Sequence, residues 1–425
     1  MRTRAAPTTA PDPLGAETAF VLTLLVLGYA VVSGLVTRWY FAPALVFVAL
    51  GVALGPFGIG VLEAGDDASS FTLVAQLALT LILFNQAVDL DLAAVWHRGE
   101  VTFRLLVVGI PLALVLGTAT ALLVLPVMPV WEAVCLAAIV APTEVALIHT
   151  LLDDRRVPER LRHALSTESG FYDGFALAAV LAALALASDR TDPDAGRWGY
   201  FLLRTELLSV GVGLAIGVAG GWVITRSRGR GWMNDTWAQL ATLAVALLCF
   251  QVGEHVHGSG FVAAFAGGLA YAFAARRAGQ RIDMHVSEAA GELLELMVFA
   301  LFGAYAVVVG WRDADWRVVV FAVAVVLGVR LVAVSLALTR TDLPARHRLF
   351  LGWFGPRGIG TLVLGLIVVE RGEIEQAGLI TQIAVVTVTL SLVIHSASAW
   401  PGIRWLGATP ERERGGTSSD VPPRA

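Results

Sequence analysis

Long apolar runs, each of about 20 residues, follow one another along almost the whole 425-residue chain and are joined by short connectors. A run of this length spans the hydrocarbon core of a bilayer as an α-helix. A membrane β-barrel would instead show strands of about ten residues with alternating polarity. The pattern therefore predicts an all-α polytopic membrane protein with about 13 transmembrane helices. The runs lie near residues 17–37, 42–63, 71–92, 101–125, 131–152, 165–188, 200–224, 236–255, 259–275, 291–310, 316–338, 348–369 and 376–398.

The composition excludes most soluble classes of protein. Hydrophobic residues make up 57% of the chain, mean hydropathy is +0.74 and charged residues are only 15%, against about 25% in soluble domains. The net charge of −4 gives no basic field for nucleic acid. Without a zinc spacing, a P-loop or a dinucleotide-binding fingerprint, we expect no cofactor, no metal centre and no enzyme activity. Cys135 and Cys249 lie inside apolar runs and are interpreted as small core residues.

Three regions are expected along the chain. Residues 1–16 are polar and proline-rich and form a predicted extracytoplasmic tail, residues 17–398 form the membrane domain, and residues 408–425 form a predicted disordered cytoplasmic tail. The first apolar run is long enough to span, so we interpret it as a mature helix and not as a cleaved signal.

Arginine provides the whole basic charge of the chain, with 30 Lys+Arg and no lysine, and its distribution predicts the orientation. Cytoplasmic connectors carry the excess of basic residues. Fifteen arginines fall after odd-numbered runs, and eight fall at the N-terminus or after even-numbered runs. This asymmetry predicts an N-terminus outside and a C-terminus in the cytoplasm.

Three of the apolar runs contain polar or helix-breaking groups that are costly in a bilayer. The fifth run contains Ala-Pro-Thr-Glu at 141–144, the sixth contains Glu-Ser-Gly-Phe-Tyr-Asp-Gly at 168–174, and the twelfth contains Gly-Pro-Arg-Gly-Ile-Gly at 355–360. Proline removes a backbone donor and clashes with the preceding turn. The fifth and twelfth helices are therefore predicted to be broken, which is tolerated at membrane depth where the backbone lines a site.

The two predicted broken helices are seven spans apart, and an odd shift inverts the topology. Paired broken helices in oppositely oriented halves indicate a transporter built from two inverted repeats, with its site at the repeat interface. The ends of the half-helices would offer carbonyl and amide groups to an ion. Asp173, on the sixth helix, would add a carboxylate.

The eleventh run carries Arg330, which needs a buried acidic partner. Either Glu168 or Asp173, both on the sixth helix, can supply it. The acid that is not neutralised remains free to exchange a proton for a cation. By contrast, Glu292 and Glu295 at the start of the tenth helix are expected to form a solvated face, since acids favour helix N-termini.

Several stretches resemble the monovalent cation–proton antiporters of the NhaP and sodium–hydrogen exchanger type. They are APTEVALIHT, STESGFYDGFALAAV, GSGFVAAFAGGLAYAF, ELLELMVFALFGAYAV and FLGWFGPRGIGTLVLGLIVVERG, in that order along the chain. The resemblance implies a multi-pass protein of the cytoplasmic membrane that works as a homodimer. In such proteins a six-helix core moves against the dimer domain in an elevator-like displacement.

The resemblance also implies roles for individual residues. Asp173 matches the carboxylate that binds the cation or the proton in alternation. Ser169 and Thr143 match oxygen ligands beside it, Thr143 through its main-chain carbonyl. Glu168 matches an acid that pairs with the arginine at 330. A further match is Arg357, the arginine of the broken twelfth helix.

Three positions depart from the family pattern. Tyr172 stands where the family has the asparagine that ties the two broken helices together. Glu144-Val145 stands for Asp-Pro, which keeps the charge on a longer arm. Asn85 stands where the third helix often carries an acid. Tyr172 and Glu144 are counted among the candidate ion-binding residues, and these changes leave the choice among Na⁺, K⁺ and Li⁺ open.

The sequence therefore predicts secondary active antiport of a monovalent cation against H⁺, in which cation and proton compete for Asp173 by alternating access. One unpaired carboxylate favours one-for-one exchange, although Glu144 is a second acid. The alternative is a non-transporting membrane sensor or scaffold that keeps the antiporter fold, for which Tyr172 and Asn85 are the supporting features. A cation channel is a weaker hypothesis because the sequence shows no selectivity-filter loop or ring of acids.

Overall fold

The structure, a computed structural model, describes most of the chain. The described residues are 16–38, 42–62, 68–90, 100–152, 154–188, 195–279, 282–371 and 374–407. The predicted tails therefore lie outside the described residues, apart from Ala16, which begins the first helix.

Helices cover each of the apolar runs, and the described residues are otherwise turns and short irregular segments. Several spans are divided into two or three segments because a π-helical or 3-10 stretch interrupts them. In chain order the elements are α1 (Ala16–Arg38), α2 (Pro43–Leu54), α3 (Ala68–Asp89), α5 (Glu100–Arg104), η1 (Leu105–Gly109), α6 (Ile110–Val124), α7 (Val130–Val140), η2 (Val145–Ile148), α8 (His149–Leu152), α9 (Glu159–Ser188), α10 (Ala195–Gly229), α11 (Asp235–His255), α12 (Gly260–Arg277), α13 (His285–Phe302), η4 (Gly303–Val307), α14 (Val308–Arg312), α15 (Trp316–Val323), η5 (Ala324–Val329), α16 (Arg330–Ala337), α17 (Ala345–Trp353), α18 (Ile359–Arg371) and α19 (Ala377–Gly407).

The all-α class is confirmed, and the chain is a multi-pass membrane protein. Among the described residues, eight helical stretches are long and apolar enough to cross a membrane, and three shorter apolar helices accompany them. Helices suit this environment because every backbone group in the bilayer must be satisfied internally. The number of thirteen spans stays a prediction. The last helix, α19, runs to Gly407, beyond the predicted end of the membrane domain at 398.

The structure also confirms the two predicted helix breaks. The first lies between Val140, where α7 ends, and Val145, where a short 3-10 turn begins, so that Pro142 sits in the interruption. The second lies between Trp353 at the end of α17 and Ile359 at the start of α18. The inverted relation between the two halves of the chain stays a prediction.

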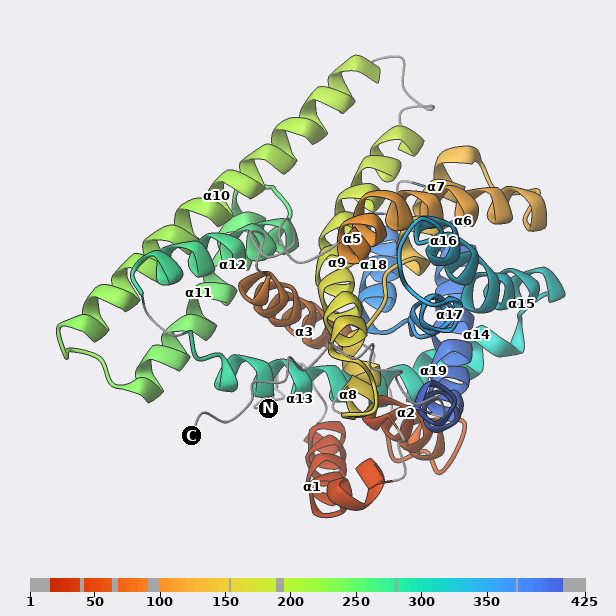
Figure 1. Ribbon diagram of the computed structural model, residues 1–425, viewed down its shortest axis with the longest axis horizontal. Helices are drawn as coiled ribbons and strands as arrows, with labels where there is room; N and C mark the ends of the chain where they lie inside the picture. Colours follow the sequence, from red (N-terminus) through yellow and green to blue (C-terminus); the bar gives the residue numbers. More distant parts are fainter. Residues whose placement is uncertain are drawn as a thin grey trace, which may run out of the picture.

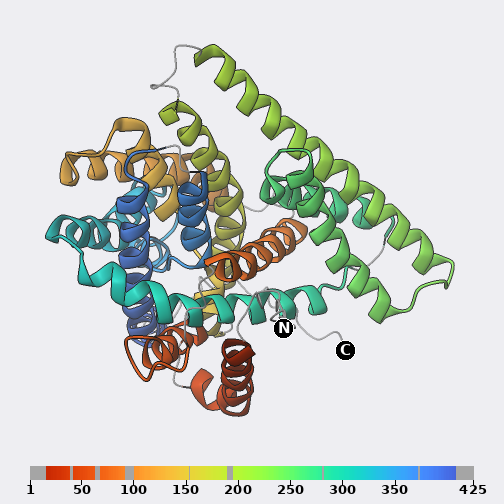
Figure 2. The same ribbon diagram turned by 180° about the vertical axis from the view of Figure 1, so that it is seen from behind.

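The helices gather in two parts of the molecule (Figure 1). Helices α10, α11 and α12 lie together on one side, and α6, α7, α15, α16 and α19 lie on the other; the view from behind shows the same division (Figure 2). Helix α3 runs from the α12 side toward the middle, where α9 and α18 lie, and α13 passes beneath it. The polar segments of α3, α9 and α18 are therefore brought toward the centre of the molecule.

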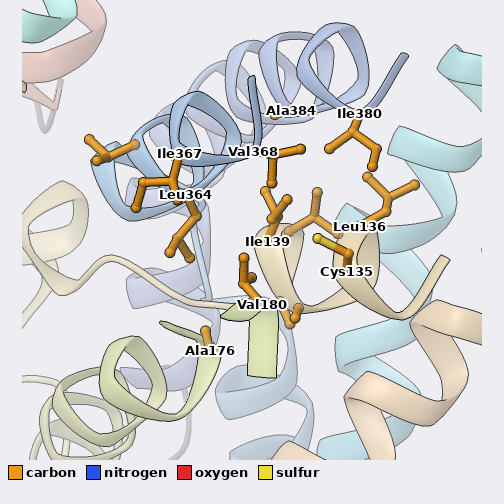
Figure 3. Close-up of a cluster of buried hydrophobic side chains, with 14 of the residues drawn as sticks. Cys135, Leu136, Ile139, Ala176, Val180, Leu364, Ile367, Val368, Ile380 and Ala384 are labelled. Atoms are coloured by element: carbon orange, nitrogen blue, oxygen red, sulfur yellow. The ribbon is translucent and has the colours of Figure 1, made fainter. Parts of the chain in front are cut away.

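Apolar side chains from four helices hold the two broken segments in place (Figure 3). Residues of α7, α9, α18 and α19 meet there in one buried cluster that includes Cys135, Ile139, Val180, Leu364 and Ile380. Cys135 and Cys249 are both buried free thiols, as predicted. Close packing of this kind fixes the helix positions that carry the polar groups.

Polar contacts fix the position of α3. The guanidinium of Arg276, near the end of α12, donates to the carbonyl oxygens of Val88 and Leu90 at 2.7 and 2.9 Å. These bonds satisfy carbonyls at the C-terminal end of α3 that lack helical partners. On the other face of α3, the Ser287 hydroxyl of α13 donates to Asn85 Oδ1 at 2.6 Å.

Candidate ion-binding site

The two broken helices cross at their interruptions and are joined through their main chains. The amide of Glu144 donates to the carbonyl oxygen of Pro356 at 2.7 Å. The close approach depends on a residue without a side chain, since a Cβ at Gly358 would lie 2.7 Å from Cγ of Glu144. The backbone groups freed by the two prolines therefore satisfy each other, as a broken helix in a membrane requires.

Arg357 stabilises the carbonyl ends of both half-helices. Its Nε donates to the carbonyl oxygen of Val140 at 2.8 Å, and its Nη1 donates to that of Gly355. Its main-chain amide donates to Ser391 Oγ of α19 at 2.8 Å. The buried positive charge thus lies where helix C-terminal ends concentrate negative potential.

Asp173 lies beside this crossing on α9 and is 4% exposed. Its carboxylate takes a side-chain hydrogen bond from Gln86 of α3. The first turn of α18 approaches from the other side, where a Cβ at Gly360 would lie 3.2 Å from Asp173 Oδ1. The positive end of that half-helix favours an anion at this point. The second oxygen, Oδ2, has no hydrogen-bond partner among the described residues.

Two of the predicted oxygen ligands contact each other one turn before Asp173. The Ser169 hydroxyl donates to the main-chain carbonyl of Thr143. Both residues are buried, and the Thr143 carbonyl belongs to the interrupted segment after α7. Glu144, the next residue, is also buried, at the crossing of the two broken helices.

Glu168 and Arg330 form a buried, bidentate ion pair. Arg330 donates from Nη1 to Glu168 Oε1 at 2.7 Å and from Nη2 to Oε2 at 2.9 Å, with a further bond to the carbonyl oxygen of Leu351 at 3.2 Å. Gly355 leaves room for this guanidinium, since a Cβ there would lie 2.7 Å from its Cζ. Of the two acids that the sequence offers to Arg330, the structure pairs Glu168 with it and leaves Asp173 without an ion pair among the described residues.

Tyr172 does not tie the broken helices together in this structure. Tyr172 is 2% exposed and packs in the apolar cluster, and its hydroxyl has no hydrogen-bond partner in the part of the chain that the structure describes. The tie is made instead by the Glu144 amide and the Arg357 guanidinium.

Two residues at the site were not predicted from the sequence. Gln86 follows Asn85 directly, and the helical turn points its amide toward Asp173 while Asn85 contacts α13. His395 of α19 is 3% exposed, with Nδ1 3.1 Å from Ser391 Oγ and Nε2 2.9 Å from the carbonyl oxygen of Trp353. The sequence signal for Gln86 was an amide inside an apolar run. The signal for His395 was its position four residues after Ser391, a spacing that places the histidine and the serine on one helix face.

The geometry can hold a proton or a small cation at Asp173. A buried carboxylate without a protein counter-ion is stable when it is protonated or when it binds a cation. Carboxylate, carbonyl and hydroxyl oxygens, the groups that small hard cations prefer, lie close together where α9 meets the first break. Among the described residues, no group of three or more His, Cys, Asp or Glu side chains is placed to hold a metal ion.

Comparison with known proteins identifies one family of membrane transporters. A family model described as "Sodium/hydrogen exchanger, transmembrane" matches residues 21–403. A probable Na⁺/H⁺ antiporter of Schizosaccharomyces pombe is 24% identical over 379 residues, which cover 82% of this chain and 49% of that protein. The K⁺/H⁺ antiporter NhaP of Alkalimonas amylolytica is 25% identical over 414 residues, which cover 93% of this chain and 69% of that protein.

The fold is similar to that of a solved antiporter. The structure of the sodium proton antiporter MjNhaP1 from Methanocaldococcus jannaschii at pH 8 matches with a TM-score of 0.74 at 18% sequence identity. The match covers 89% of this chain and 98% of that chain. This chain spans about half the length of the yeast relative and 61% of the K⁺/H⁺ antiporter NhaP2 of a Shewanella strain.

Proposed function

We propose that this chain, which belongs to the transmembrane sodium/hydrogen exchanger family, exchanges a monovalent cation for H⁺ across a membrane. Asp173 is the group for which the cation and the proton compete. The relatives named as Na⁺/H⁺ and K⁺/H⁺ antiporters support the reaction class and leave the choice among Na⁺, K⁺ and Li⁺ open.

One observation carries the proposal: of the two buried acids on α9, Glu168 is neutralised by Arg330, and Asp173 has no ion pair among the described residues. A proton and a cation compete for a site when both neutralise the same charge. Paired groups such as Glu168 and Arg330 keep the core electrically balanced while the charge on Asp173 changes.

The neighbouring oxygens complete the proposed site. Ser169 and the main-chain carbonyl of Thr143 are proposed as cation ligands, because they already contact each other one turn from Asp173. Glu144 and Tyr172 are proposed to shape the site rather than to bind the ion directly. Arg357 is proposed to compensate the half-helix carbonyls when the ion is absent.

The family and the arginine distribution support a proposal for location and assembly. We propose a homodimer in the cytoplasmic membrane, with the N-terminus outside and the C-terminus in the cytoplasm. The arginine excess after odd-numbered runs supports that orientation. The proposed movement is an elevator-like displacement that exposes Asp173 to each side in turn.

The test is proton flux in everted vesicles from a host that lacks its own antiporters. Vesicles are energised, Na⁺, K⁺ or Li⁺ is added across a pH series, and collapse of the pH gradient is recorded. We expect one or more of these cations to collapse the gradient with the wild-type chain, and no response with Asp173→Asn. Competition for one carboxylate also predicts that the apparent KM for the cation rises as pH falls, by up to tenfold per pH unit, while the maximal rate stays constant.

The alternative, a sensor or scaffold with the antiporter fold, gives the opposite outcome. If no cation collapses the gradient at any pH while the protein is present in the membrane, transport is refuted and the alternative leads. A KM that does not change with pH would contradict competition at a single carboxylate even if exchange occurs.

A further inference from the structure

Glu295 is a further buried acid, and it is not among the residues proposed for the ion site. It was expected on a solvated face together with Glu292. Glu292 is exposed, as expected, but Glu295 is only 6% exposed and this part of the expectation is wrong. The physical reason is the side of the helix on which it lies: α13 begins at His285, so Glu295 lies well inside the helix, on the same side as the buried residues Ser287 and Gly291.

No basic group compensates Glu295. Among the described residues it has no ion pair and no hydrogen bond, and its electrostatic neighbours are two other acids, Glu292 and Asp173. Glu168, in contrast, is buried to a similar degree and is held by Arg330. A buried acid with only acidic neighbours must carry a proton or a bound cation, because an isolated charge in the membrane interior is costly.

The face of α13 that carries Glu295 is directed at α3. Ser287, Gly291 and Glu295 are spaced by four residues, which places them along one side of the helix. Ser287 donates to Asn85 Oδ1 at 2.6 Å, and a Cβ at Gly291 would lie 3.7 Å from Asn85 Nδ2. This side of α13 therefore packs directly against α3.

Helix α3 connects this face to the transport site. Its Asn85 contacts α13, and its next residue, Gln86, donates a hydrogen bond to Asp173. Figures 1 and 2 both show α3 leading to the region where α9 and α18 lie, with α13 passing beside it. Asp173 therefore meets α3 at Gln86, and the side of α13 that carries Glu295 meets α3 at the neighbouring residue, Asn85.

We propose that Glu295 is a second carboxylate of the transport site, which shares the bound cation or proton with Asp173. This inference rests on the proposed antiport function. It assigns Glu295 a role in cation affinity, and it makes the charge of the site depend on two acids, both without a protein counter-ion. A proton or a cation held between the two carboxylates then reduces the repulsion between them.

The first test labels the wild-type protein and needs no variant. Carbodiimides react with protonated carboxyl groups in apolar surroundings, and the labelled residues are mapped by mass spectrometry. We expect labelling of both Asp173 and Glu295, and protection of both by the cation that is transported. Glu168, which is held by Arg330, is the internal reference and stays unlabelled.

The second test compares Glu295→Gln with Glu292→Gln, its exposed neighbour on the same helix. In the vesicle assay we expect Glu295→Gln to raise the apparent KM for the cation at least tenfold, Glu295→Asp to raise it less, and Glu292→Gln to leave it within twofold. A purely structural role for Glu295 would lower the amount of protein or the maximal rate without changing KM.

The outcomes separate this inference from the proposed function. Cation protection of Asp173 without protection of Glu295, or an unchanged KM in Glu295→Gln, refutes the role of Glu295 and leaves antiport intact. Absence of both wild-type exchange and cation protection at either acid refutes both proposals.

Discussion

The buried ion pair between Glu168 and Arg330 provides a quantitative test of how the core balances its charges. The two hydrogen bonds measure 2.7 and 2.9 Å, and the side chains are 2% and 3% exposed. Removing one partner of such a pair leaves an uncompensated buried charge, so we expect Glu168→Gln and Arg330→Met each to lower the free energy of unfolding by about 4 kcal/mol. The measurement is a denaturant titration of the purified protein in mixed micelles.

The double variant Glu168→Gln/Arg330→Met removes both charges at once. It should be no less stable than either single variant, because removing the whole buried pair leaves no uncompensated charge. Simple addition would give a loss of about 8 kcal/mol. We therefore expect a coupling energy of about 4 kcal/mol or more between the two positions.

A second ion pair of the chain provides a matched control, because its charged atoms are equally close but its side chains are more exposed. Glu100 and Arg104 also approach to 2.7 Å, but their side chains are 49% and 28% exposed. Solvent screens such a pair, and Glu100→Gln should change stability by less than about 1 kcal/mol. The reasoning is refuted if the double variant loses as much as the two single variants together, or if Glu100→Gln costs as much as Glu168→Gln.

The remaining predictions concern the surroundings of the proposed site. Gly360→Ala places a methyl group 3.2 Å from Asp173 Oδ1, so it should raise the cation KM in the vesicle assay; an unchanged KM would mean that the first turn of α18 does not border the ion. His395→Gln should lower unfolding free energy by about 1–3 kcal/mol, because buried hydrogen bonds to Ser391 and to the Trp353 carbonyl are lost or lengthened; a calorimetric scan that shows no loss of stability would contradict this. Ser169→Ala should raise the KM severalfold with protein levels maintained, and equal affinity for wild type and variant would exclude the hydroxyl as a ligand.

Local features of the sequence predicted the architecture well. Length and hydropathy are properties of consecutive residues, so the apolar runs identify the helices. Pro142 and Pro356 weaken the helix locally, because proline lacks the amide and its ring clashes with the preceding turn, although α19 continues through Pro401. These effects act over a few residues and need no knowledge of what lies across the interior.

The partners of the buried charges could not be predicted from the sequence in the same way. Arg330 needed an acid, but two acids lie five residues apart on α9, and the choice of Glu168 joins positions 162 residues apart. The role of Gln86 could not be predicted either, because an amide in an apolar run has no distinctive signal until a carboxylate lies beside it.

The burial of Glu295 also could not be predicted from the sequence. The predicted start of its helix at 291 lies six residues after the actual start at His285, and the side of α13 that carries Glu295 faces the interior while Glu292 is exposed. The sequence by itself determined that this chain spans a membrane, where its helices lie along the chain, and which of them are broken. Only the tertiary structure decided which acid is neutralised by arginine and which acids are not, because that depends on the distances between helices far apart in the sequence, and electrostatic interactions in a low-dielectric interior change steeply with those distances.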